Sequence, residues 1–255
     1  MISIENKSKE QKEAIISFLK SIDKPILLGM SGGLDSSVVA KLCSESIRTR
    51  ALMLPERTTP EDSTEDAIDL ARELGIEHEV IDIDAAVRAL GPFKNRASEA
   101  NAKARVRMCF LYKKANEEGC LVAGTGNKSE IMVGYSTKFG DGACDLLPIG
   151  DLYKTEVRFL AKEIRIAEKI VKKVPSADLY PGQTDEGELG IDYTTLDLIL
   201  RGLELQASDE AIASELGKTI DTVRRIRSMV YGSKHKRSPP LIIKLGTRTP
   251  WIDWL

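Results

Sequence analysis

Short runs of consecutive apolar residues recur along the first half of the chain, and each is typical of a buried strand. They lie at residues 25–28, 50–54, 79–83 and 120–124. Apolar residues at helical spacing fill the intervals between and before them, at residues 8–22, 38–46, 58–75 and 97–116. This alternation predicts an α/β fold, a Rossmann-like parallel sheet with helices on both faces. Ligands are then expected at the carboxyl ends of the strands.

The second half of the chain has two stretches without periodicity. Residues 127–150 mix charged, aromatic and glycine positions, which favours a ligand-contacting loop. After a predicted helix at 153–164, residues 175–191 form a second irregular stretch. We expect this second stretch to be a mobile lid, of which Pro181–Leu189 becomes ordered when ligands bind.

The last third of the chain is predicted to be helical, with spacing that resembles a helix-turn-helix. In a DNA-binding protein this arrangement would place four residues near a groove: Thr222, Arg224, Arg225 and Arg227. A small helical substructure packed on the sheet is the alternative, and the negative overall charge favours it.

Composition narrows the class of protein. The chain has 255 residues, 42% hydrophobic and 30% charged, with a formal net charge of −2. We expect one domain over residues 1–255, no nucleic-acid partner and no membrane span. The four cysteines are widely spaced and the N-terminus is polar, so reduced thiols in the cytoplasm are the simplest interpretation.

Candidate chemistry begins at the loop between the first strand and the following helix, Gly-Met-Ser-Gly-Gly-Leu-Asp-Ser-Ser at 29–37. Its glycines permit a sharp turn and close approach of a ligand, and its amides with the helix N-terminus favour anions. Asp35 is suited to hold a metal beside phosphates. We therefore interpret the loop as an ATP pyrophosphate site rather than a turn that merely ends a strand.

The loop lacks the Gly-Lys-Ser/Thr of a Walker A motif. Its Ser-Gly-Gly-x-Asp-Ser string resembles the PP-loop of ATP pyrophosphatases. That resemblance implies cleavage of ATP between the α- and β-phosphates, adenylation of a substrate and release of pyrophosphate.

Further motifs follow the loop in a fixed order, at residues 103–108, 124–130, 138–142, 181–190 and 235–237. Together with the PP-loop they resemble those of ammonia-dependent NAD synthetases. The resemblance covers nearly the whole chain. It implies a ligase with a PP-loop fold (adenine nucleotide alpha hydrolase-like) and a helical C-terminal part, acting as a homodimer. In that family deamido-NAD and ATP give an NAD-adenylate, which ammonia converts to NAD, the last step of NAD biosynthesis.

The same resemblance implies the roles of individual residues. Asp35 and Glu130 would bind Mg²⁺ and, with Lys154, form the catalytic set; a surface salt bridge is the plain alternative for Glu130. ATP, the co-substrate, would contact Gly29, Met30, Ser31, Gly32, Gly33, Leu34, Asp35, Ser36, Thr125, Lys154 and Ser176. Many relatives carry Thr at the position of Ser176, which keeps the hydroxyl.

Five residues would bind deamido-NAD: Arg105, Lys138, Asp145, His235 and Lys236. Arg105 is suited to a phosphate or carboxylate, although an exposed helix arginine is the alternative. Asp145 would accept from ribose hydroxyls or cap a turn. His235 lies in a basic run, where donation to an anionic substrate suits it better than general-base catalysis.

Three alternatives remain open from the sequence. One is another PP-loop adenylating ligase or amidotransferase, including RNA-modifying ligases, which would be expected to show a basic surface. Another is a non-catalytic ATP-binding regulator. The third is glutamine as nitrogen source, for which the short segment before the first strand leaves no room for a glutaminase domain; free ammonia is therefore expected.

Overall fold

The computed structural model of the chain describes residues 1–180, 182–250 and 253. Within them, a four-stranded parallel sheet has the order β3-β2-β1-β4. The strands are β1 (Ile26–Gly29), β2 (Thr49–Met53), β3 (Glu77–Val80) and β4 (Leu121–Ala123). The chain adds β2 and β3 on one side of β1 and then returns to place β4 on the other. This reversal opens a crevice between the carboxyl ends of β1 and β4.

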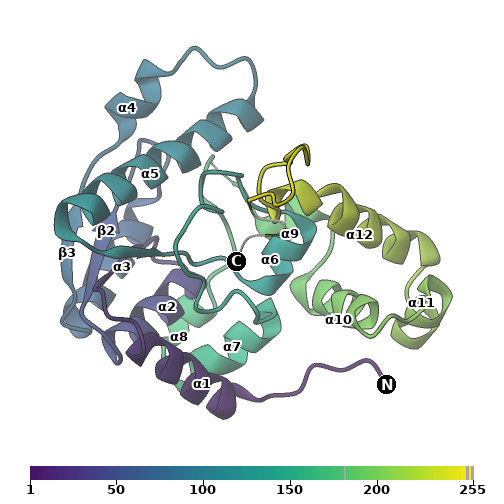
Figure 1. Cartoon of the computed structure of the whole chain (residues 1–255). Helices are drawn as coiled ribbons and strands as arrows, with labels where there is room; N and C mark the ends of the chain where they lie inside the picture. Colours follow the sequence, from purple (N-terminus) through teal and green to yellow (C-terminus); the bar gives the residue numbers. More distant parts are fainter. Residues whose placement is uncertain (181, 251–252, 254–255) are drawn as a thin grey trace.

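Helices cover both faces of the sheet, which confirms the fold predicted from the sequence (Figure 1). One face packs against α1 (Ser8–Lys20), α2 (Leu34–Ser44), α3 (Glu61–Glu73), α7 (Lys154–Glu163) and α8 (Glu168–Val171). The other face packs against α4 (Asp84–Ala89) and the long α5 (Arg96–Glu118).

The central strands β1 and β2 are mostly apolar because both of their faces are buried. Leu27 and Leu52 belong to the core under α5, whereas Leu28 and Met53 belong to the core under α2 and α7. All four side chains are at most 1% exposed. Such strands read as continuous apolar runs rather than alternating ones, as observed here.

The C-terminal helices form a separate core beside the sheet. They are α10 (Tyr193–Glu204), α11 (Asp209–Leu216) and α12 (Ile220–Gly232), followed by a 3-10 turn at Lys234–Lys236. Their apolar faces pack on α6 (Lys128–Val133) and on Tyr153 just before α7, rather than on the strands as the sequence suggested. Figure 1 shows α10, α11 and α12 side by side, away from the sheet.

The arginines of the helix-turn-helix-like region make contacts within the protein. Arg225 donates to the carbonyls of Leu189 and Gly190, at 2.7 and 3.3 Å. Arg227 and Arg224 pair with Asp209 of α11, at 2.7 and 3.8 Å. These bonds tie α12 to its neighbours.

Two irregular stretches contain short helices that the sequence pattern did not reveal. Residues 127–150 include α6, and residues 175–191 include α9 (Asp185–Leu189). The expectation of continuous irregular structure is therefore wrong at both places, because five or six residues are too few to show a period. Pro181, the first residue of the part of the lid predicted to become ordered, lies outside the described residues.

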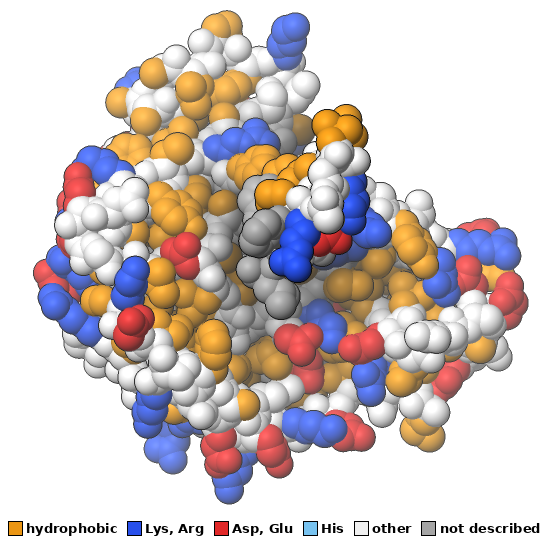
Figure 2. Space-filling view, viewed as in Figure 1, with side chains coloured by type: hydrophobic (Ala, Val, Ile, Leu, Met, Phe, Trp, Pro, Cys, Tyr) orange, Lys and Arg blue, Asp and Glu red, His pale blue; other side chains and the backbone are white. Residues whose placement is uncertain are grey.

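Within the part of the chain that the structure describes, no helix combines the length and apolarity needed to cross a membrane. Acidic and basic side chains are intermixed along the lower edge of the view in Figure 2, over α1 and α7.

Candidate active site

A cavity of about 750 Å³ opens at the carboxyl ends of the strands. Gly29 of β1, Met53 of β2 and Ala123 of β4 line it, and Arg107 reaches it from α5. The loop that follows β1 forms one wall, and residues 173–180 form another. The fold thus brings the candidate motifs to one hollow, at the edge of the sheet where the sequence placed them.

The loop after β1 is held in shape by its own hydroxyl groups. Ser36 Oγ donates to the carbonyl of Gly33 at 3.1 Å and lies 3.1 Å from Ser31 Oγ. Ser37 Oγ donates to the same carbonyl at 2.8 Å. Gly32 adopts a φ of 76°, in the left-handed region that favours glycine. These bonds curl the loop ahead of the N-terminus of α2, which is the geometry that suits a bound anion.

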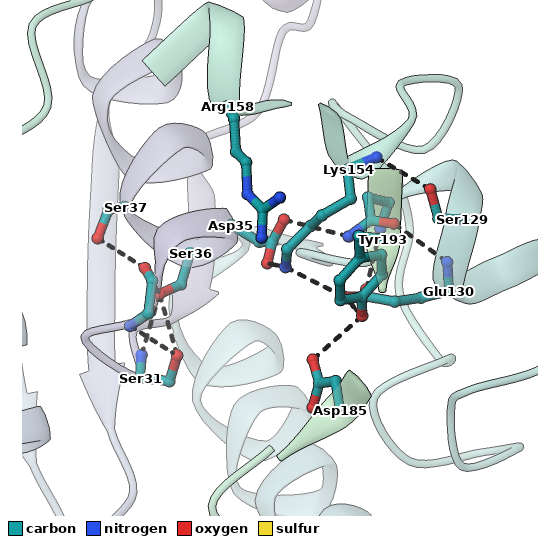
Figure 3. Close-up of polar contacts among 12 residues, drawn as sticks. Ser31, Asp35, Ser36, Ser37, Ser129, Glu130, Lys154, Arg158, Asp185 and Tyr193 are labelled. Carbon is teal, nitrogen blue, oxygen red and sulfur yellow. Dashed lines mark hydrogen bonds and ion pairs between the residues drawn. The ribbon is translucent and has the colours of Figure 1, made fainter. Parts of the chain in front are cut away.

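The ammonium of Lys154 lies between two carboxylates from distant parts of the chain (Figure 3). Its Nζ contacts Asp35 Oδ2, from the first turn of α2, and lies 3.3 Å from Glu130 Oε1 of α6. The Lys154 side chain is only 3% exposed. Lys154 is the first residue of α7, so three helix N-termini meet at this point.

Further polar groups hold the two carboxylates in place. Asn127 caps α6 and shares a capping box with Glu130, and its Nδ2 donates to Asp35 Oδ1 at 3.2 Å. The hydroxyl of Tyr193 lies 3.3 Å from Glu130 Oε1 and 3.1 Å from Asp185 Oδ2. The second oxygen of Asp185, Oδ1, is buried and has no partner among the described residues. The site therefore holds three carboxyl groups around one ammonium.

Burial and neighbouring charges both shift the pKa values of these groups. Burial raises the pKa of Glu130; the positive charge of Lys154 opposes this shift, and the negative charges of Asp35 and Asp185 add to it. Burial also raises the pKa of Asp185. For Lys154, burial favours the neutral amine, but the charges of Asp35 and Glu130 outweigh it and raise the pKa of the ammonium above its usual range. Lys154 is consequently a permanent cation at this site.

Asp35 and Glu130 suit the Mg²⁺ that the family resemblance implies. Within the described ranges, no cluster of three or more acidic, histidine or cysteine side chains could hold a metal ion by itself. Mg²⁺ in nucleotide sites uses one or two carboxylates and takes its remaining ligands from phosphates and water. Two carboxylates that already share one cation, beside an unpartnered oxygen of Asp185, match that requirement.

A buried carboxylate behind the site, Asp197 of α10, fixes the starts of α6 and α7. It accepts from Ser129 Oγ through Oδ1, and from Thr155 N and Oγ1 through Oδ2 at 2.8 and 2.7 Å. Ser129 Oγ in turn accepts from Lys154 N at 2.9 Å. Asp197 is fully buried, so α10 sets the backbone positions beside both Glu130 and Lys154.

Most residues predicted to contact ATP line this one cavity. They are Gly29, Met30, Ser31, Gly33, Leu34, Asp35, Ser36, Thr125, Lys154 and Ser176. Gly32 is not among the lining residues, and its positive φ shapes the turn of the loop. The ATP contacts themselves stay predictions.

Four of the five residues predicted to bind deamido-NAD lie together near the cavity. Arg105 Nε donates to the carbonyl of Lys138 at 3.3 Å, and Lys138 Nζ donates to the carbonyl of His235 at 2.6 Å. Lys236, next in sequence, lines the cavity and donates to two carbonyls. The fifth, Asp145, lies apart and accepts from Val122 N of β4 at 2.7 Å.

Sequence reasoning missed four residues of the site: Asn127, Asp185, Tyr193 and Asp197. The Asn127–Glu130 capping box was readable as a spacing signal. Asp185 lay in a recognised motif but had no assigned role. Nothing in the pattern marks Tyr193 or Asp197, because both occur within an ordinary amphipathic helix and meet the site only through tertiary packing.

Comparison with known proteins identifies the family. Residues 11–240 match the family model described as NAD synthase. The chain belongs to the NAD synthase family. The resemblance seen in the sequence is thereby confirmed, and the site described above is the candidate active site of a family member.

Individual family members resemble this chain over most of its length. The NH(3)-dependent NAD(+) synthetase of Archaeoglobus fulgidus is 45% identical over 250 residues, covering 91% of this chain and 96% of that protein. A solved NH3-dependent NAD synthetase from Campylobacter jejuni is 28% identical with a TM-score of 0.80, over 95% of this chain and 100% of that one. The solved NMN synthetase from Francisella tularensis is 32% identical with a TM-score of 0.83, over 94% and 100%.

Proposed function

We propose that this NAD synthase family member is a ligase that amidates deamido-NAD with ammonia, forming a C–N bond and converting ATP to AMP and pyrophosphate. In the first step, a carboxylate oxygen of deamido-NAD attacks the α-phosphorus of ATP. The bond between the α- and β-phosphates breaks, and pyrophosphate leaves. In the second step, ammonia attacks the carbonyl carbon, AMP leaves with the carboxylate oxygen, and a proton is lost from nitrogen.

The residues at the cavity match the needs of the first step. The curled loop at 29–37 and the N-terminus of α2 would hold the departing pyrophosphate. Lys154, a buried and permanent cation, would stabilise the negative charge that grows on the phosphates. Asp35 and Glu130 would hold Mg²⁺, which supplies charge neutralisation for the phosphates when bound.

The second step requires that water be kept from the acyl-adenylate until ammonia attacks. Residues 174–180 lie over the cavity and carry Ser176, the predicted ATP contact. Exclusion of water at this place favours amide formation over hydrolysis. Arg105, Lys138, His235 and Lys236 would hold the anionic dinucleotide, and Asp145 would contact a ribose.

One observation carries the proposal most directly. Lys154 lies between Asp35 and Glu130 at the end of an anion-binding loop, in a cavity that opens where parallel strands end. The relatives named NH(3)-dependent NAD(+) synthetase favour this reaction over other PP-loop chemistries.

Several finer properties belong to the same proposal. We propose one domain spanning 1–255, a homodimer, and action in the cytoplasm, where the four free thiols would stay reduced. Sedimentation analysis would measure the oligomeric state. Atomic absorption and titration would measure Mg²⁺ binding.

The deciding experiment gives the purified protein ATP, Mg²⁺ and deamido-NAD with either ammonium or glutamine, and measures NAD, AMP and pyrophosphate. A parallel arm replaces deamido-NAD with nicotinate mononucleotide, because one solved relative is named NMN synthetase. We expect NAD from ammonium, with AMP and pyrophosphate in equal amounts. Absence of NAD with ammonium, or formation of ADP and phosphate, would reject the proposed reaction.

A further inference from the structure

A short segment separates two hollows in this protein. Residues 174–180, here called the cover, lie between α8 and α9. Leu179 and Tyr180 line the active-site cavity of about 750 Å³ and also a second cavity of about 530 Å³ on their other side. A segment with a hollow on each side has little apolar packing to hold it. Its position must depend on a few polar contacts.

One of these contacts comes from a buried ion pair next to the cover. Lys103 of α5 and Glu56, which follows β2, lie 3.0 Å apart with side chains 1% and 0% exposed. Lys103 Nζ donates to the main-chain carbonyl of Leu179 at 2.8 Å and to Thr58 Oγ1 at 3.1 Å. The Leu179 carbonyl of the cover is thus bonded to an ammonium that Glu56 also holds in place.

The Lys103 ammonium makes its shortest hydrogen bond to the cover. It has three N–H donors, and its three nearest acceptors are Leu179 O, Glu56 Oε1 and Thr58 Oγ1, with Glu99 Oε1 farther away at 3.4 Å. Removal of the cover would leave one donor of a buried charge with only this longer contact to Glu99, which is costly. The cover is also bonded to the segment that follows it: Leu179 N donates to Gln183 Oε1 at 2.8 Å, and Asp185 N donates to the carbonyl of Pro175 at 3.0 Å. On the side of α3 and α5 its other contacts are longer: Ser63 Oγ donates to Asp178 at 3.4 Å, and Arg96 stacks on Tyr180 at 4.6 Å.

We propose that Lys103, held by Glu56, is a positioning residue that latches the cover over the adenylated substrate and so protects the adenylate from water. This inference rests on the proposed function, because it requires an adenylate to protect. Neither Lys103 nor Glu56 contacts the reacting atoms in this role. The latch determines what share of the adenylate reacts with ammonia rather than with water.

The test measures AMP and NAD together at low ammonium for the wild-type protein and its variants. Lys103→Met removes the latch but leaves the buried Glu56 carboxylate without its cation. The Lys103→Met/Glu56→Gln double variant avoids this by removing both charges. Lys113→Met is the matched control on the same helix, where an exposed lysine pairs with Glu117 at 2.9 Å. In the wild-type protein and the control, AMP and NAD should form in equal amounts.

In both latch variants we expect AMP to exceed NAD by about tenfold, since a hydrogen bond to a charged group is worth enough to shift the closed–open equilibrium by that factor. Rising ammonium should bring the ratio back toward one, because ammonia then outcompetes water. Tyr180→Ala, which weakens the cover from its own side and leaves the ion pair intact, should raise the ratio by a smaller factor. Chymotrypsin should cut the latch variants faster after Leu179, because Pro181 protects the bond after Tyr180.

The outcomes separate the latch from the reaction. If the wild-type protein makes NAD and the folded double variant keeps equal AMP and NAD, the latch is rejected and the proposed function stands. If the wild-type protein makes no NAD, the proposed function itself fails.

Discussion

Gly32 and Ser63 lie so close that the loop after β1 has no room for a side chain at this point. A Cβ on Gly32 would stand 2.0 Å from the carbonyl oxygen of Ser63, at the start of α3. The contact joins the anion-binding loop to a second helix, and it places backbone rather than a flexible side chain against the glycine. The shape of the loop therefore depends on this one position twice, through its positive φ and through this contact.

Gly32→Ala is expected to lower both stability and ATP binding. The left-handed φ alone costs about 1–2 kcal/mol for a residue with a Cβ, and the clash with Ser63 must add to it. Urea unfolding and ATP titration would measure the two effects. Gly75→Ala is the matched control, because Gly75 has a φ of 65° but no atom within 4 Å of the added Cβ. Equal losses in the two variants would show that the Ser63 contact contributes nothing.

Lys154→Met is expected to lower the rate of NAD formation by roughly 100-fold or more, the usual loss when a group that stabilises transition-state charge is removed. It also leaves Asp35 and Glu130 facing each other without their shared cation. Steady-state kinetics would measure the loss, with circular dichroism to check the fold. Lys172→Met, which removes an exposed lysine paired with Glu168, should keep the wild-type rate. A Lys154→Met protein with normal turnover would contradict the assigned role.

Asp197→Ala is expected to destabilise the protein by about 2–4 kcal/mol, because buried donors on Ser129 and Thr155 lose their acceptor. Turnover of the folded fraction should also fall, since the backbone beside Glu130 and Lys154 loses its support. Asp192→Ala, on the same helix, removes only an N-cap and should cost about 1 kcal/mol with unchanged turnover. Unchanged kinetics in folded Asp197→Ala would restrict Asp197 to a purely structural role.

Stability should depend on pH through Glu204. Its hydrogen bonds with Lys128, Arg201 and Tyr153, against the opposing effect of burial, lower its pKa from 4.5 to about 2. A carboxyl whose pKa is lowered on folding stabilises the protein above its unfolded pKa, and this contribution is lost as pH falls toward the folded value. Glu204→Gln should therefore have a lower Tm than wild type at pH 7, and the gap should narrow below pH 4.5. A gap that stays constant down to pH 3 would exclude this linkage.

The sequence predicted the central part of the fold because its signals there are local. The strands β1, β2 and β4 are short and buried on both faces, and their apolar runs are bounded by glycine or charged residues. The edge strand was less well placed. Apolar residues at 79–83 predicted it two to three residues late, whereas β3 covers Glu77–Val80 and is largely exposed. Ile81 and Ile83 are instead anchored by main-chain bonds to Met53 and Pro55 beyond the strand.

The sequence predicted those residues of the candidate site that lie in recognisable motifs. Gly29, Gly33, Asp35, Glu130 and Lys154 were all proposed from the sequence, and the structure brings them to one cavity. The supporting groups were not, because Tyr193 and Asp197 lie more than forty residues from Glu130 and Lys154 in sequence respectively. Their role arises from how α10 packs on α6 and α7, which no local pattern encodes.

The position of Lys154 also bears on what the protein needs in order to fold. Its ammonium acts as an internal counter-ion for Asp35 and Glu130, so their mutual repulsion is balanced before any ligand arrives. Folding and metal loading should therefore be uncoupled, in contrast to sites whose carboxylates rely on a bound ion to come together. A chelator should stop turnover without unfolding the protein, and the protein should stay folded across a range of magnesium concentrations.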